Sequence, residues 1–168
     1  MKRSSIVIGL LAFLLTTILT GCSNLPPLEE AMNDYSEIVA GDLPEDIRLT
    51  IYYLNPDILT RIPLSKDDLA TFPGVVKINV NSEELASHWS LLKELNPSIL
   101  HLVEKETHMN ARLYYVFEVG DSNKILEVVI SNIHGSVYVN GIEVEDNPIF
   151  YELIVHFLTE EGRNTLGI

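Results

Sequence analysis

The chain has little cysteine and few basic residues. Cys22 is the only cysteine among 168 residues, so neither an internal disulfide nor a thiolate metal site of several cysteines can form. Lysine and arginine total 11 against 24 acidic residues, a formal net charge of −13. This imbalance argues against nucleic acid as a partner, since surface charge would repel a polyanion.

Long apolar runs are also missing. The longest, Ile6–Leu19, is shorter than the roughly 20 residues that a membrane-spanning helix needs. Lys2 and Arg3 precede it and small residues follow, a layout typical of a secretory signal peptide. A true transmembrane anchor is the alternative interpretation.

The end of this run carries the most specific motif in the chain. Leu19-Thr20-Gly21-Cys22 resembles the lipobox of bacterial lipoproteins. The resemblance implies that Cys22 receives a diacylglyceryl group and that the lipoprotein signal peptidase recognises Leu19, Thr20 and Gly21 and cuts before Cys22. Two acyl chains hold a protein firmly at a membrane. The implied location is the extracytoplasmic side of the cell membrane, with the membrane itself as a partner.

The same resemblance divides the chain into three parts: a signal peptide (1–21), a lipidated N-terminus with a short tether (22–27), and one globular domain (28–168). The five residues after Cys22 reach no more than about 17 Å, which would keep the domain close to the membrane. With Cys22 acylated, the domain would have no cysteine nucleophile.

Hydrophobic periodicity in the domain predicts an α+β fold, in which amphipathic helices pack on a mainly antiparallel sheet in two layers. The C-terminal half reads as a meander of strands, with the two central strands apolar on both faces. Helices are predicted over 28–39, after the Ser65 cap, over 82–95 and from Pro148 to 158, and Asn81, with Glu84 three residues on, is predicted to cap the third of them. Strands are predicted over 46–54, 75–80, 111–119, 124–131, 137–139 and 142–144.

The strongest local signal is the pair Asn140-Gly141, which favours a two-residue type I′ turn between two strands. In that register Val139 lies opposite Ile142, and Tyr138 lies opposite Glu143 on the other face.

No pattern in the chain names a reaction. None of the five histidines has a metal-binding spacing, no G-x-S-x-G elbow is present, and Ser90-x-x-Lys93 lacks the partner motifs of penicillin-binding proteins. We therefore predict no catalytic residue, metal or cofactor, and a protein that is not an enzyme. The alternatives are a small cell-envelope hydrolase using paired acids, or a metal-binding protein using His101 and His108.

Strand tyrosines suggest a binding role instead. Alternation places Tyr52 opposite in direction to Tyr53, and Tyr114 to Tyr115, so one tyrosine of each pair belongs to the core. The other tyrosine of each pair, here taken as Tyr52 and Tyr114, lies on the opposite sheet face, and Tyr138 is the third candidate for that face. If that face is uncovered, these tyrosines would form an interaction surface for a protein partner in the cell envelope. If helices cover both faces, the tyrosines are part of the core.

A second resemblance covers about a third of the domain. The segments 115–119, 127–130 and 135–137 are similar in spacing to the exported PepSY domain, in which a helix precedes strands and a glycine-turned hairpin. The sequence thus predicts a lipid-anchored extracytoplasmic protein that binds a partner.

Overall fold

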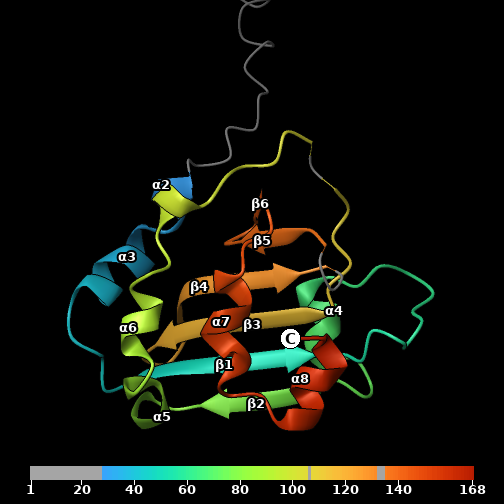
Figure 1. The fold of residues 1–168 in the computed structure, drawn as a ribbon, viewed down its shortest axis with the longest axis horizontal. Helices are drawn as coiled ribbons and strands as arrows, with labels where there is room; N and C mark the ends of the chain where they lie inside the picture. The colour runs from blue at the N-terminus through green and yellow to red at the C-terminus, as the bar shows by residue number, and fades with distance from the viewer. Residues whose placement is uncertain (1–27, 106, 132–134) are drawn as a thin grey trace, which may run out of the picture.

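The structure, a computed structural model, describes residues 28–105, 107–131 and 135–168. The predicted signal peptide and the lipobox at Cys22 lie outside the described residues. The described chain forms one six-stranded antiparallel sheet in the order β2-β1-β3-β4-β5-β6, with helices packed on it (Figure 1). The predicted α+β class is confirmed.

Strand order confirms the C-terminal meander and the central place of the third and fourth strands. Strand β1 inserts between β2 and β3, so only the last four strands follow chain order. The strands are β1 (Ile47–Tyr53), β2 (Val76–Val80), β3 (Leu113–Val119), β4 (Asn123–Ile130), β5 (Val137–Val139) and β6 (Ile142–Val144).

The β5–β6 hairpin has the predicted register. Val139 pairs with Ile142, and Tyr138 pairs with Glu143. The turn residues Asn140 and Gly141 have φ angles of 48° and 86°, as a type I′ turn requires.

One sheet face, called the first face, carries the main core. Its central side chains are Ile51, Tyr115 and Phe117, which are fully buried. They share this face because alternation points every second residue of β1 and β3 to the same side of the sheet. Six helices supply the other half of this core: α2 (Leu28–Ala31), α3 (Asn33–Ala40), α5 (Ser82–Ala86), α6 (Trp89–Leu92), α7 (Ile149–Val155) and α8 (Glu160–Leu166). Helix α7 crosses the sheet (Figure 1) and buries Ile149, Phe150, Leu153 and Ile154.

Three helix predictions need correction. The helix predicted over 28–39 divides at Met32 into α2 and α3. The helix predicted over 82–95 begins as expected at the Asn81–Glu84 capping box, but it divides into α5 and α6. The break falls at His88, whose φ and ψ of −117° and 8° lie outside the helical region. The last predicted helix ends at Val155, and a separate helix, α8, follows from the Thr159 cap. A short 3-10 turn, η1 (Pro97–Ile99), follows α6.

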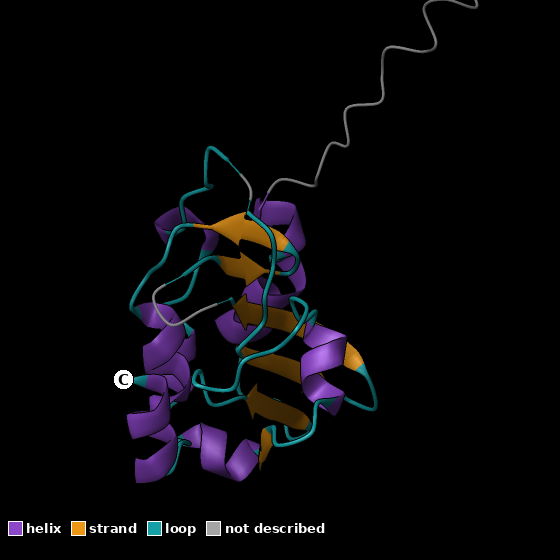
Figure 2. Ribbon diagram, turned by 90° about the vertical axis from the view of Figure 1, so that its right-hand side faces the viewer, coloured by secondary structure: helices purple, strands orange, loops and turns teal. Residues whose placement is uncertain are grey.

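The opposite face, called the second face, is partly covered. Helix α4 (Lys66–Thr71), capped by Ser65 as predicted, packs Leu69 onto a smaller apolar cluster there. Figure 2 shows helices on both sides of the sheet. In the described part of the chain, no helix has both the length and the apolar character to cross a membrane.

Candidate functional site

The three tyrosines predicted as an interaction surface all lie on the second face, but two of them are buried. Tyr114 is 4% exposed and Tyr138 is 7% exposed, while Tyr52 is half-buried. The Tyr138 hydroxyl donates to the carbonyl of Thr107 at 2.9 Å. An open tyrosine patch is therefore wrong for Tyr114 and Tyr138, because α4 and the segment at Thr107 cover this part of the sheet.

Tyr114 belongs to a polar network centred on Glu127 of β4. The Tyr114 hydroxyl donates to Glu127 Oε1 at 2.6 Å, Lys124 Nζ donates to the same atom at 2.8 Å, and Lys66 Nζ donates to Oε2. Burial alone would raise the pKa of Glu127, but these donors outweigh it and lower the pKa to about 2. Burial, and then the hydrogen bond to Glu127, raise the pKa of Tyr114.

The Glu127 network is therefore structural. A carboxyl group that is ionised above about pH 2 is not a proton donor at neutral pH, which argues against Glu127 as a hydrolytic acid. Its ion pair with Lys66 instead attaches α4 to the sheet.

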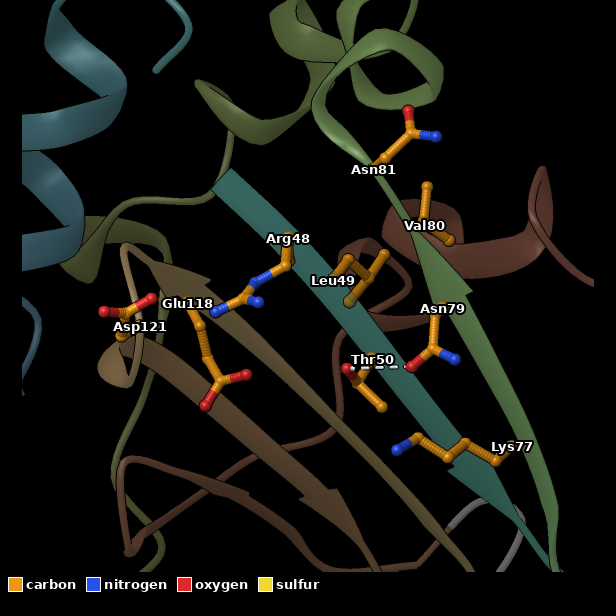
Figure 3. Close-up of a pocket in the computed structure, with 9 residues that line it drawn as sticks. All are labelled: Arg48, Leu49, Thr50, Lys77, Asn79, Val80, Asn81, Glu118 and Asp121. Carbon is orange, nitrogen blue, oxygen red and sulfur yellow. Dashed lines mark hydrogen bonds between the residues drawn. The ribbon is translucent and has the colours of Figure 1, made fainter. Parts of the chain in front are cut away.

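The uncovered end of the second face is hollowed. A hollow of about 510 Å³, here called the polar hollow, lies over β2, β1 and the end of β3. Its lining residues are Arg48, Leu49, Thr50, Lys77, Asn79, Val80, Asn81, Glu118 and Asp121 (Figure 3).

Strand alternation explains why the hollow is polar. Arg48 and Thr50 of β1 share the second face with Lys77 and Asn79 of β2, and Thr50 lies directly opposite Asn79. Helix α4 packs over the other end of these strands, at Leu54 and Tyr114. The polar end of the sheet consequently stays open to solvent.

Charges of both signs line the hollow. Arg48 lies opposite Glu118 in the β1–β3 register, and its Nη2 donates to the Gly120 carbonyl. The Lys77 ammonium lies 5.3 Å from the centre of the Tyr52 ring, at cation–π distance. Among described residues both ion pairs within 4.0 Å are made by Glu127, so the charges of the hollow are not neutralised by direct pairing.

Among the described residues, His101 and His108 are not part of any metal-binding group. Within the described ranges, no group of three or more His, Cys, Asp and Glu side chains is arranged to hold a metal ion. The structure instead pairs two others, since the rings of His88 and His156 lie 4.4 Å apart. Burial, and then the charge of His156, lower the pKa of His88. Because His88 and His156 lie far apart in the sequence, no sequence pattern predicted this contact.

The Ser90-x-x-Lys93 match lies on α6 and its lysine has other contacts. Lys93 Nζ donates to the Gly41 carbonyl at 3.2 Å and lies 6.0 Å from the centre of the Trp89 ring. This arrangement is that of a surface lysine packed on neighbouring groups.

Comparison of the chain with protein-family models, with curated proteins and with solved structures gives no match. The lipobox and PepSY resemblances therefore remain predictions from the sequence.

Proposed function

We propose that this protein is an extracytoplasmic lipoprotein, anchored through diacylglyceryl-Cys22, whose domain binds a protein partner at the open end of its sheet. The observation that carries the binding role is the polar hollow, where Arg48 and Lys77 line an open surface of an otherwise acidic chain. A solvent-exposed sheet face with unpaired charges of both signs suits recognition of a polar partner.

The position of the hollow suits a protein held at a membrane by its N-terminus. Helix α2, where the described domain begins, lies at the β5–β6 end, since Asn140 Nδ2 donates to the Ala31 carbonyl (Figure 1). Strand β2 forms the opposite edge of the sheet. Five strand spacings of about 4.8 Å place the two edges about 24 Å apart. An anchor at Cys22 would hold the β5–β6 end nearest the membrane and leave the hollow accessible.

The hydrolase alternative receives less support from the same geometry. The hollow contains Glu118 and Asp121, but none of the four histidines among the described residues lines it. Catalysis by two carboxylates needs one of them to keep a proton near neutral pH. The pKa shifts resolved for described carboxylates, those of Glu127, Glu143 and Asp68, are all downward.

Two experiments test the proposal. Cys22→Ala should abolish incorporation of labelled fatty acid into the protein, whereas the neighbouring Ser23→Ala variant should remain labelled. A photo-reactive residue at Asn79, in the hollow, should form a discrete cross-link in intact cells, and Arg48→Ala should weaken that cross-link. The same photo-reactive residue at Glu37, on the exposed side of α3, is the control. Equal labelling from both positions would contradict a binding role for the hollow.

A further inference from the structure

Strand β2 is an open edge of the sheet. Its strand neighbour is β1, and residues Val76–Val80 make no other backbone hydrogen bond to described residues. The opposite edge is partly closed, because Leu102 forms a bridge with Val144 of β6. The outward N–H and C=O groups of β2 are thus available to another chain.

This edge is flanked by a hollow on each face. On the second face, Lys77 and Asn79 line the polar hollow. On the first face, a hollow of about 350 Å³ lies between β2 and α8. Its lining residues are Tyr53, Asn55, Gly74, Val76, Ile78, Thr159, Glu161 and Thr165. Alternate residues of β2 therefore face two separate concave surfaces.

We propose that β2 binds an extended segment of a partner protein as a seventh strand. Backbone hydrogen bonds to the edge would supply affinity, and side chains of the added strand would alternate between the two hollows and supply specificity. The proposal deepens the proposed function by naming the kind of partner, and it rests on the binding role but not on the lipid anchor.

The lining residues specify the chemistry of that segment. Side chains opposite Val76 and Ile78 share the first face and meet these two apolar side chains, of which Val76 is 42% exposed. The α8 side of the same hollow is polar. The side chain opposite Lys77 shares the second face with this lysine and with Arg48, so an acidic residue fits there. The bound segment thus alternates apolar residues with polar ones, one of which is acidic.

Charge also selects against a second copy of this chain. Two copies each carry a net charge of −13, and this repulsion opposes pairing of two identical domains. Lys77 on this edge strand also opposes pairing with a basic strand, since like charges directly opposite each other are destabilising. An acidic, otherwise apolar segment of another protein satisfies both constraints.

The test uses a defined probe, an end-blocked peptide Val-Thr-Val-Glu-Val, and the full-length chain in detergent micelles. In an antiparallel register its glutamate lies opposite Lys77 and its valines opposite Val76, Ile78 and Val80. At saturation the peptide should slow amide hydrogen exchange within Val76–Val80 by about tenfold. The matched peptide with lysine in place of glutamate should bind about tenfold more weakly, and Lys77→Glu should reverse that preference.

Backbone pairing has its own control. Two control peptides of the same sequence are N-methylated, one at the odd-numbered and one at the even-numbered residues. At least one of them should give no protection, because N-methylation removes the backbone donors that pair with β2. Undiminished protection with both N-methylated peptides, or no protection by the glutamate peptide, would overturn the proposal. Slow exchange in β2 without peptide, together with a dimer in solution, would identify a second copy as the occupant and also overturn it.

Failure of this proposal and failure of the proposed function are distinguishable. The peptide experiment is done in detergent and does not require lipidation. A negative peptide result with a positive Asn79 cross-link would leave the polar hollow as a binding site without strand addition.

Discussion

The Tyr114 hydroxyl donates a 2.6 Å hydrogen bond to Glu127 Oε1 from the next strand of the sheet. Tyr114 also stacks on Tyr52, with ring centres 5.5 Å apart and planes 10° from parallel. This relationship explains why a residue predicted as part of an exposed surface is instead part of the fold. The tyrosine body fills the smaller core while its hydroxyl satisfies a partly buried carboxylate.

Acid stability should depend on Glu127. Its folded pKa of about 2 lies below the ordinary 4.5, so its stabilisation is present above pH 4.5 and is lost as pH falls towards 2. Glu127→Gln should lower the free energy of unfolding at pH 7 by roughly 2–3 kcal/mol and by much less near pH 2. Urea titrations at both pH values measure this. Glu45→Gln, at an exposed position, is the control, and equal losses at both pH values would contradict the account.

Tyr114→Phe isolates the hydroxyl. The substitution keeps the ring stacked on Tyr52 but removes one donor to Glu127, so stability at pH 7 should fall by about 1–2 kcal/mol. In the Glu127→Gln background the same change should cost less, since the two residues act as a pair. Chemical denaturation of the wild type, the two single variants and the double variant gives the coupling free energy between Tyr114 and Glu127. Strictly additive effects would argue against the network.

The His88–His156 contact should be visible in a titration. Because the pKa of His88 is lowered from 6.5, its contribution to stability is present above pH 6.5 and is lost as pH falls through the folded pKa. NMR titration of the His88 ring should give a midpoint below 6.5, which moves up in His156→Gln. A His88 midpoint that does not respond to His156 would show that the charge of its neighbour has no effect.

The β5–β6 turn should require its asparagine. Asn140 has a φ of 48°, accepts from the Glu127 amide at 2.7 Å and donates to Ala31. Asn140→Ala loses both bonds and strains the backbone, and should cost about 2–3 kcal/mol. Asn140→Gly loses the same bonds but tolerates positive φ, so it should cost about 1 kcal/mol less than Asn140→Ala. Thermal unfolding compares the two, and equal losses would assign the whole effect to the side-chain bonds.

Local signals in the sequence predicted those parts of the fold that local chemistry determines. The Asn140-Gly141 register and the Ser65 and Asn81 caps follow from residues within a few positions of one another, and the structure contains all three. The Thr159 cap of α8 carried the same kind of signal, a side chain that accepts from an amide three residues on, but it was missed.

Long-range packing could not be predicted in the same way. The Ser65 cap predicts a helix but not that α4 lies on the second face and buries Tyr114. The polar hollow likewise depends on β1 inserting between β2 and β3, which brings Arg48 beside Glu118 from far along the chain. Alternation alone placed the polar side chains on one face of each strand, but only the strand order brings them together.

The central claim is that this domain works at the membrane surface through a lipid on Cys22. The most direct measurement is the mass of the N-terminal peptide from membrane-extracted protein. The account predicts a peptide that begins at Cys22 and carries a diacylglyceryl group, and no such peptide from Cys22→Ala. An unmodified Cys22 in a peptide continuous with Gly21 would contradict it.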